Sequence, residues 1–395
     1  MAMLAGVGTS TENYAENAVS QALAKAVESL AGYPPSLLIV IASPTTYDQS
    51  KLLSECKKKY PDTEIVGCSS SGEITSAGPV DKSVAIAAIY SDQSTLVTGV
   101  GTGIKENPRK TGQEFANNIL QKTNGEKPKV AVIFPDGLAG NGAEIVRGVL
   151  DIYGDDFKLA GGSAGDDFQF KQTYQYFNDK VLTNSITGFA IVGNVNFGIG
   201  VRHGWIPIGI SRIVTKAVSN IVYELDGKPA IEIYEEHFGK DTLVIKSGEP
   251  FAKLAITYPI GILTPDYDEY LIRDPLSVDN NGAITFAAEI PLGSEVNLMI
   301  GSREEAINAA QTAAKNALNQ VAGKNIKLAF LFNCIARKKL MMDKKKEEIE
   351  RIMQVFGPGV PLIGFYTYGE QAPVGNNKTT CSFHNETDVI LVITE

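Results

Sequence analysis

The chain has 395 residues, which is long enough for two or three domains with sizeable cores. Its formal charge is −9, from 36 basic and 45 acidic residues, and this balance argues against nucleic acid or an anionic membrane surface as a partner. No apolar run approaches the ~20 residues that a membrane helix needs, so membrane insertion is not predicted.

The cysteines and the first residues of the chain favour a cytoplasmic protein. The four cysteines lie far apart and form no CxxC pair, so neither a zinc site nor a redox motif is predicted. No basic segment followed by an apolar core opens the chain, so no signal peptide is predicted. We therefore expect a cytoplasmic location with reduced thiols.

The first ninety residues alternate between apolar strands and amphipathic helices. Alanine, valine and leucine recur at helical spacing between residues 12 and 30, which predicts a helix that packs closely on a sheet. Thr9 or Ser10 is expected to cap this helix, with Glu12 as the capping-box partner. The predicted strands are 3–8, 37–42, 65–67 and 84–90, and the predicted helices are 12–30 and 49–60.

The same order of elements recurs twice, which indicates duplicated subdomains, since units of about 90 to 105 residues are too long for a solenoid repeat. In the second copy we expect strands 95–100, 129–134, 159–160 and 186–192, with helices 111–122 and 142–153. In the third copy we expect strands 296–300, 327–332, 362–365 and 381–393, with helices 304–321 and 339–356, and with Gly301-Ser302 capping the first of these helices.

The predicted fold class is α/β, with two modules built from three related strand-helix-strand-helix-strand-strand units and mixed sheets flanked by helices. The first module spans 1–194, with pseudo-repeats at about 1–92 and 93–194. The second spans 195–395, with an irregular β-rich part at 195–291 and the third α/β unit at 292–395. The basic run 337–346 is followed by glutamates, which favours a solvated helix face.

In each unit a strand leads into a glycine, then into small or hydroxyl-bearing residues, and then into a glycine followed by an acid. The three stretches are GCSSSGE at 67–73, GGSAGD at 161–166 and GFYTYGE at 364–370. Backbone N–H groups there, with the hydroxyls of Ser69, Ser70 and Ser163, can hold a carboxylate. The acids of these loops can meet an ammonium group; they are Glu73, Asp166 and Glu370. The alternative is structural: the glycines permit tight turns and the acids form hydrogen bonds within them.

The last of these loops is the favoured ligand site. In extended chain Tyr366, Tyr368 and Glu370 share a face, and His384 follows on the next strand. Aromatic walls with one carboxylate suit a cationic or amino ligand. The alternative is a strand that lines the core, with Glu370 in a turn. Arg273 can clamp a ligand carboxylate, or it can form an ion pair between domains.

Cysteine and histidine offer two further hypotheses. Cys334 is a candidate nucleophile with His384, because the nearby Arg337 would favour a thiolate; the alternative, for Cys334 and for Cys68, is an inert buried thiol. The chain has three histidines without HxH or HExxH spacing, so no metal site is predicted. One of them can serve as an axial haem ligand, the alternative being an ordinary buried or surface histidine.

The ordered set of motifs resembles one family. Gly8-Thr9-Ser10 before an alanine-rich helix, GCSSSGE and GGSAGDD resemble the N-terminal module of FIST proteins. The segments 222–230 (VYELDGKPA), 270–273 (YLIR) and 332–337 (FNCIAR), with GFYTYGEQAP and FHNET, resemble the C-terminal FIST module. The likeness covers essentially the whole chain.

The resemblance implies a sensory protein that binds a small ligand, and amino acids are the ligand class proposed for the family. Family members occur alone or attached to signalling outputs. Because two modules account for the length of this chain, we expect the signal to pass to a separate partner such as a kinase, chemoreceptor or cyclic-dinucleotide enzyme. No cofactor and no catalytic residue are predicted. The alternatives are a haem-based sensor of nitric oxide, as some members are reported to be, and a Cys-dependent enzyme.

Overall fold

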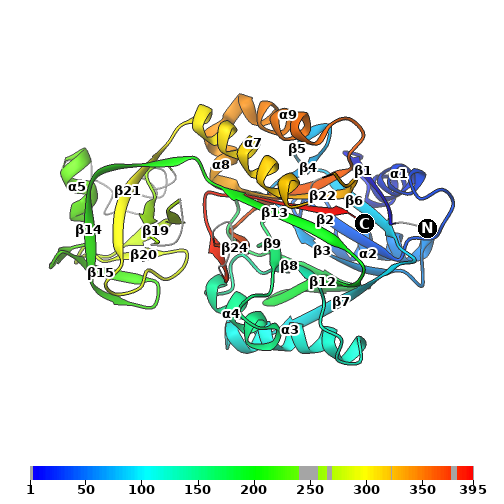
Figure 1. The fold of residues 1–395 in the computed structure, drawn as a ribbon, viewed down its shortest axis with the longest axis horizontal. Coiled ribbons are helices and arrows are strands. Elements are labelled where there is room, and N and C mark those ends of the chain that lie inside the picture. The colour runs from blue at the N-terminus through cyan, green and yellow to red at the C-terminus, as the bar shows by residue number, and fades with distance from the viewer. Residues whose placement is uncertain (1–2, 240–256, 265–268, 322, 375–379, 395) are drawn as a thin grey trace.

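The computed structural model describes residues 3–239, 257–264, 269–321, 323–374 and 380–394. They form the predicted α/β fold, with several mixed sheets flanked by helices (Figure 1). Within these residues, every helix is too short or too polar to span a lipid bilayer.

The first unit follows the predicted order. The strand β2 is apolar at every position because both of its faces are covered. The alanines of α1 allow it to lie close on β1, where Gly6 and Gly8 approach its backbone carbonyls. The elements are β1 (Leu4–Ser10), α1 (Ala15–Glu28), β2 (Leu37–Ala42), α2 (Gln49–Lys59), β3 (Glu64–Ser69), β4 (Glu73–Thr75), β5 (Gly78–Val80) and β6 (Val84–Tyr90).

The other two units repeat this plan. The second comprises β7 (Ser94–Thr102), α3 (Pro108–Lys122), β8 (Val130–Pro135), α4 (Gly142–Tyr153), β9 (Leu159–Gly162), β10 (Gln175–Phe177), β11 (Lys180–Leu182) and β12 (Ser185–Gly193). The third comprises β13 (Asn196–Arg202), α7 (Arg303–Gln320), β22 (Ile326–Cys334), α8 (Ile335–Met341), α9 (Lys345–Phe356), β23 (Leu362–Thr367), β24 (Glu370–Pro373), β25 (Cys381–His384) and β26 (Asp388–Thr394).

The three units exchange hairpins in a cycle. In each unit the sheet order is first, last, second and third strand, as in β1-β6-β2-β3. The next two strands of each sheet come from another unit: β10–β11 extends the first sheet, β24–β25 the second and β4–β5 the third. This cyclic exchange ties the units into one body, which we call the three-unit body.

The inner faces of the three sheets share one core. Strands of all three units contribute to it, and the rings of Phe134, Phe332 and Phe365 meet there at centroid distances of 5.9 to 6.3 Å. The helices cover the outer faces and form a separate core with each sheet. Burial on both faces explains why the central strands read as continuous apolar runs.

A β-rich subdomain, residues 205–301, is inserted between β13 and α7 and extends to one side of the three-unit body (Figure 1). Its described strands form a separate sheet in the order β18-β17-β21-β14-β15-β20-β19, with β16 beside β15. The elements are β14 (Trp205–Val218), β15 (Ile221–Leu225), β16 (Lys228–Pro229), α5 (Glu232–Phe238), β17 (Ile260–Ile262), β18 (Leu271–Arg273), β19 (Pro275–Val278), β20 (Ile284–Phe286) and β21 (Glu295–Gly301).

The structure corrects four local predictions. The predicted strand 381–393 is two strands, β25 and β26, and the predicted helix 339–356 is divided between α8 and α9. Residues 296–300 lie in β21 of the subdomain sheet, and β13 supplies the first strand of the third unit, because the insertion separates β13 from α7. The predicted cap of α1 is also wrong: Ser10 still pairs with Val84 in the sheet, and the residue before α1, Tyr14, makes no side-chain cap. The predicted Ser302 cap of α7 is confirmed, since its side chain accepts from the Glu305 N–H.

Candidate functional site

The three loops that the sequence singles out, which we call the hub loops, meet one another. The Ser71 N–H donates to the Tyr366 carbonyl at 3.2 Å, and the Gly165 N–H donates to the Ser69 carbonyl at 3.0 Å. The Ser163 N–H donates to the carbonyl of Gly369 at 2.8 Å. The loops therefore converge, but they pack directly on each other and satisfy one another's backbone groups.

The predicted polar residues of the first two hub loops are buried and hydrogen-bonded within the protein. The Ser69 hydroxyl donates to the Gly165 carbonyl at 2.7 Å, and the Ser163 hydroxyl accepts from the Gln371 amide at 2.9 Å. The Asp166 carboxylate accepts from the backbone N–H groups of residues 170, 171 and 172. These contacts stabilise the loops, so a ligand that used the same groups would have to displace them.

Glu73 and Glu370 hold equivalent places in the first and third units. Glu73 accepts from the hydroxyl of Ser70 and from the Ser83 N–H, and Glu370 accepts from Thr367 in the same way. Each carboxyl group thus ties a hairpin to its own unit. Burial raises the pKa of Glu73 to about 8 and raises the pKa of Glu370 well above its usual range.

The two tyrosines of the last loop do not share a face with Glu370, so that prediction is wrong. β23 ends at Thr367, and Gly369 with φ of +132° turns the chain before β24 begins. Tyr366 packs in the outer core of the third unit. Tyr368 stacks on Phe170 with ring centroids 4.9 Å apart and donates to Asp166 at 2.5 Å.

The turn that leads into the last strand of each unit has a residue with positive φ. These residues are Lys82 (φ 54°), Asn184 (φ 53°) and Glu386 (φ 59°). Asparagine is at ease in this conformation, and Lys82 extends into solvent. Glu386 differs from both, because its side chain is completely buried. A buried glutamate with a left-handed backbone conformation is energetically unfavourable at a turn.

Glu386 faces a second carboxyl group. In the described part of the chain, no N–H or hydroxyl group donates to either of its carboxylate oxygens, and the group points to the carboxyl of Asp274. Burial, and then the charge of Asp274, raises the pKa of Glu386 well above its usual range. Burial raises the pKa of Asp274 to about 6. The raised pKa favours the protonated form of Glu386, in which this group can donate to the Asp274 carboxylate.

Several predicted site residues surround this carboxyl pair. Burial raises the pKa of the Cys334 thiol well above its usual value, and the charges of Glu370, Glu386 and Asp274 raise it further. His384 lies on β25 with Nε2 3.2 Å from the Ala372 carbonyl, and burial and then the charge of Arg273 lower its pKa to about 3. The structure thus brings the predicted residues Arg273, Cys334, Glu370 and His384 into one region. Asp274 and Glu386 lie in the same region but were not predicted as site residues.

The pair lies across the contact between the subdomain and the three-unit body, which we call the seam. Asp274 follows β18 of the subdomain, whereas Glu386 precedes β26 of the body. Near it, Nη1 of Arg273 donates to the Phe383 carbonyl at 2.9 Å. Arg147 of α4 pairs with Glu289 of the subdomain at the same seam.

Beside the seam, Arg337 forms a buried ion cluster. Its Nη2 lies 2.5 Å from Glu348 and 2.7 Å from Asp388, and all three side chains are 0% exposed. Burial alone would lower the pKa of Arg337, but the two carboxylates outweigh it and raise the pKa. Arg337 is therefore not on a solvated face, because α8 turns it inward and leaves Lys338 to pair with Asp81 on the surface.

The thiol and histidine geometry does not favour the two alternative functions. A nucleophilic cysteine needs a depressed pKa, and that of Cys334 is raised. Haem needs a hollow beside its axial ligand, yet no histidine lines either of the two hollows described for the chain, of about 950 and about 10 Å³. His203 is buried, with its Nδ1 accepting from the Trp205 N–H at 2.8 Å. Haem therefore stays a prediction of the resemblance.

Glu386 was not predicted as a site residue from the sequence, because it was considered only as part of the FHNET motif. A signal existed: aligning the three units places DKS (81–83), TNS (183–185) and NET (385–387) at the same turn, and the acid stands where the others have lysine and asparagine. Asp274 carried no such signal, since it lies in the insertion that the repeat does not share.

Comparison with protein families agrees with the architecture. The FIST N domain matches residues 36–228, and the FIST C domain matches residues 230–373. The chain belongs to the FIST family. FIST domains are small-ligand sensory domains, which makes the protein a member of a sensory, signal-transducing family.

Curated relatives match this chain over most of its length. "Uncharacterized protein MT0656" of Mycobacterium tuberculosis is 25% identical, with 96% of this chain and 98% of the relative covered. "Uncharacterized protein MJ1623" of Methanocaldococcus jannaschii is 25% identical, with 91% and 73% covered. Among solved structures, a cyanuric acid hydrolase matches with a TM-score of 0.37 and 8% identity over 100% of both chains. A chorismatase matches with a TM-score of 0.37 and 9% identity over 100% of this chain and 98% of its own.

Proposed function

We propose that this FIST protein is a sensor whose ligand carries a protonated amino group that binds at the Glu386–Asp274 pair. The observation that supports this proposal is that Glu386 is a fully buried carboxyl group. It receives no hydrogen bond from an N–H or hydroxyl donor of the described chain. Buried polar groups without partners are rare in folded proteins, and they cluster at sites that receive a ligand.

The chemistry of the pair suits an ammonium group. Such a group supplies three N–H donors and a positive charge, so it can replace the shared proton and satisfy both carboxylates. Amino acids are the first ligand class to test, because Arg273 lies next to Asp274. Its Nε and Nη1 donate to backbone carbonyls, and among the described residues no acceptor takes Nη2, which leaves that edge for a ligand carboxylate.

Access to the pair requires the seam to open, because Glu386 is 0% exposed. The two carboxyl groups belong to different bodies, and the chain passes between these bodies at residues 202–205 and 301–303. Gly204, with φ of +86°, lies in the first of these connections. A ligand that binds better to the open seam shifts the subdomain relative to the three-unit body, and a separate signalling partner would read that shift.

The test is a thermal-shift titration of the whole protein with the twenty amino acids and a panel of small amines at pH 7. A ligand at about 100 times its Kd stabilises by about 2.7 kcal/mol, which raises the Tm of a protein of this length by about 3 °C. At least one amine-bearing ligand should do so for the wild type and not for Glu386→Gln. Lys82→Gln, at the equivalent turn of the first unit, is the matched control and should respond like the wild type.

The pH dependence identifies the group. Because binding displaces the proton held by Glu386, affinity should fall as pH falls from 7 to 6, by up to about tenfold. The proposal is refuted if no amine in the panel shifts the wild type, or if Glu386→Gln responds as strongly as the wild type does.

A further inference from the structure

The three units have equivalent edge strands, and their equivalence can be fixed residue by residue. A β-carbon added to Gly6 of β1 would lie 3.0 Å from the Cβ of Ser29, and one added to Gly198 of β13 would lie 3.0 Å from the Cβ of Gln320. The end of α1 at Ser29 therefore corresponds to the end of α7 at Gln320. The strand residue that follows each glycine, Val7 or Ile199, is then equivalent too.

Two of the three edges are closed by side chains. At β7, the Thr98 N–H donates to the Glu64 carboxylate at 3.3 Å, and the Thr98 carbonyl accepts from Lys122 at 2.9 Å. At β13, the amide of Gln320 accepts from the Ile199 N–H at 3.2 Å and donates to the Ile199 carbonyl at 2.7 Å. In both places the outward backbone groups of an edge strand are satisfied within the chain, which protects the edge.

In the part of the chain that the structure describes, no side chain satisfies the outward backbone groups of Ala5 and Val7 of β1 in this way. The Ile89 carbonyl accepts from the Ser36 N–H, so Ile89 faces away from its cross-strand partner Ala5. The N–H and carbonyl groups of Ala5, and of Val7 two residues on, therefore point outward from the sheet. Among the described residues, no side chain binds these groups of Val7, because Ser29, which stands where Gln320 stands in the third unit, is too short to reach them.

Within the described ranges of the chain, the acidic cap is absent as well. Glu64 begins β3 and pairs with Leu37, and the corresponding position before β23 is Pro361, whose carbonyl accepts from the Ala329 N–H of β22. Proline offers no side-chain acceptor for an edge N–H. The first unit is thus the one unit of the three in which both closing side chains have been replaced by residues that cannot close the edge.

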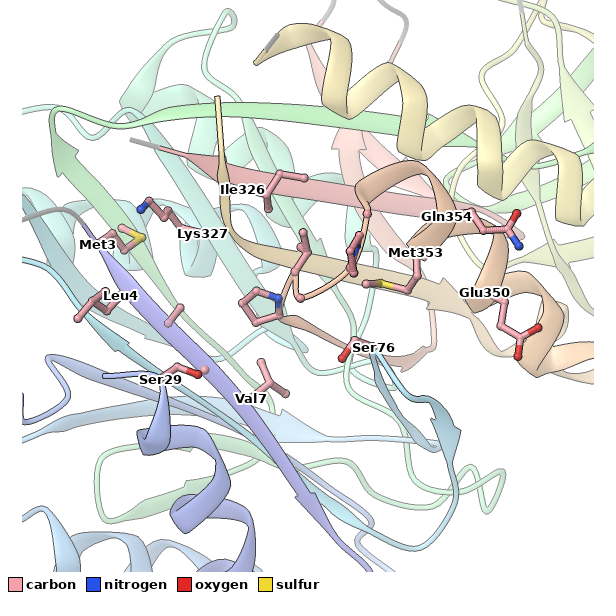
Figure 2. A pocket seen from close by; sticks show the side chains of 17 residues that line it. Met3, Leu4, Val7, Ser29, Ser76, Ile326, Lys327, Glu350, Met353 and Gln354 are labelled. Atoms are coloured by element: carbon pink, nitrogen blue, oxygen red, sulfur yellow. The ribbon is translucent and has the colours of Figure 1, made fainter. Parts of the chain in front are cut away.

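A hollow of about 950 Å³ lies along this edge, between the first and third units (Figure 2). Met3 and the β1 residues Leu4 to Val7 line one side of it, and Ser29 stands beside them. The opposite side is formed by α9 and by the turn at 357–361, which follows it. None of the predicted ligand residues lines this hollow, so it is separate from the Glu386–Asp274 pair.

From these observations we infer that the outward edge of β1 is a docking site for an extended polypeptide segment of a partner protein, which adds as a strand beside β1. Outward N–H and carbonyl groups recur along a strand every two residues, or about 6.8 Å. A ligand that satisfies them needs amide donors and acceptors at the same repeat, and an extended peptide has them. A segment of about five residues can reach the outward groups of both Ala5 and Val7.

The walls of the hollow favour a single strand over a second copy of this chain. Ser29 at the end of α1 and residues of α9 line the hollow beside the β1 edge, which leaves room there for one added strand. The lining side chains are mixed, with Leu4 and Met353 on the apolar side and Lys327 and Glu350 as opposite charges. We therefore expect a segment that alternates apolar and polar residues.

The test uses the whole protein and a phage-displayed library of random seven-residue peptides. We expect sequences that are enriched on the wild type and bind at least tenfold more weakly to Ser29→Gln, which installs the closure that β13 carries. Ser29→Ala, which stays short, should bind like the wild type. Thermal unfolding of Ser29→Gln shows that the variant is folded, and hydrogen exchange of the bound wild type should protect the amides of Ala5 and Val7.

Backbone chemistry separates strand addition from binding through side chains. N-methylation of alternate residues of an enriched peptide should weaken it at least tenfold in one register and little in the other. Equal enrichment on the wild type and Ser29→Gln, or no effect of methylation in either register, would overturn the proposal. So would a dimer of the wild type that Ser29→Gln abolishes, because the edge would then bind a second copy. Binding of the peptide by Glu386→Gln shows that the two sites are independent.

Discussion

Replacing Glu386 by glutamine is expected to stabilise the protein at pH 7 while it removes the proposed ligand response. In the unfolded chain a glutamic acid ionises near pH 4.3, so keeping this carboxyl group protonated in the fold costs at most about 4 kcal/mol at pH 7. Glutamine keeps the shape of the side chain and can donate to Asp274 without that cost. The gain corresponds to a rise in Tm of about 4 °C for a protein of this length.

The direction in which stability changes with pH follows from proton binding. The pKa of Glu386 is raised in the fold, so between its unfolded and folded values the folded state holds a proton that the unfolded state has released. The wild type therefore loses stability as pH rises, and the advantage of Glu386→Gln should shrink to about 1 kcal/mol at pH 5.

Chemical denaturation of both proteins at pH 5, 6 and 7 measures this difference directly. Lys82→Gln changes the equivalent exposed turn and should alter the free energy of unfolding by less than about 0.5 kcal/mol at every pH. A Glu386→Gln variant no more stable than the wild type at pH 7, or with an advantage independent of pH, would show that this carboxyl group is not held protonated.

Three further outcomes are expected. Arg337→Met should lower the free energy of unfolding by about 3–5 kcal/mol, since it leaves Glu348 and Asp388 buried without their counter-charge. The control is Arg109→Met, which breaks an exposed pair with Asp151 and should lower the free energy of unfolding by less than about 1 kcal/mol in the same urea titration. Glu370→Ala should cost about 2–4 kcal/mol because it strands the Thr367 hydroxyl and the Thr387 N–H; a loss below 1 kcal/mol would contradict its role as a hairpin tie. The free energy of unfolding of His384→Gln, relative to that of the wild type, should rise by about 2 kcal/mol between pH 7 and pH 5. The reason is that the pKa of His384 is low in the fold, so the wild type loses stability as the unfolded chain takes up a proton below about pH 6.5. A stability difference that does not change over this pH range would contradict the low pKa.

The repeated α/β plan could be read from the sequence because its signals are local. Buried strands such as β2 and β8 are continuous apolar runs, and α1 and α7 show alanines at helical spacing. The hairpin exchange and the place of β13 could not be read in this way, since pairing between distant strands leaves no local pattern. The insertion placed another strand, β21, directly before α7 and so imitated a continuous third unit.

The site was predicted in part for the same reason. Polar residues at the ends of strands marked the hub loops, and Arg273, Cys334, Glu370 and His384 do lie in one region of the seam. Sequence spacing could not show that the hub loops satisfy one another's hydrogen bonds, or that the chain turns between Tyr366 and Glu370. Nor could it show that Asp274, more than a hundred residues away, faces Glu386.

The internal repeat makes each unit a control for the other two, and this carries more weight than any single contact. A buried carboxyl group at one turn, or an uncapped strand edge, can each be a tolerated imperfection when seen alone. Here the same turn is built at no such cost with Lys82 and Asn184, and the same edge is closed at Thr98 and Ile199. Because the fold accepts the cheaper solution elsewhere, folding requirements do not explain Glu386 or the open edge of β1. Both departures reduce stability or invite association, and binding is the function that uses an unsatisfied group.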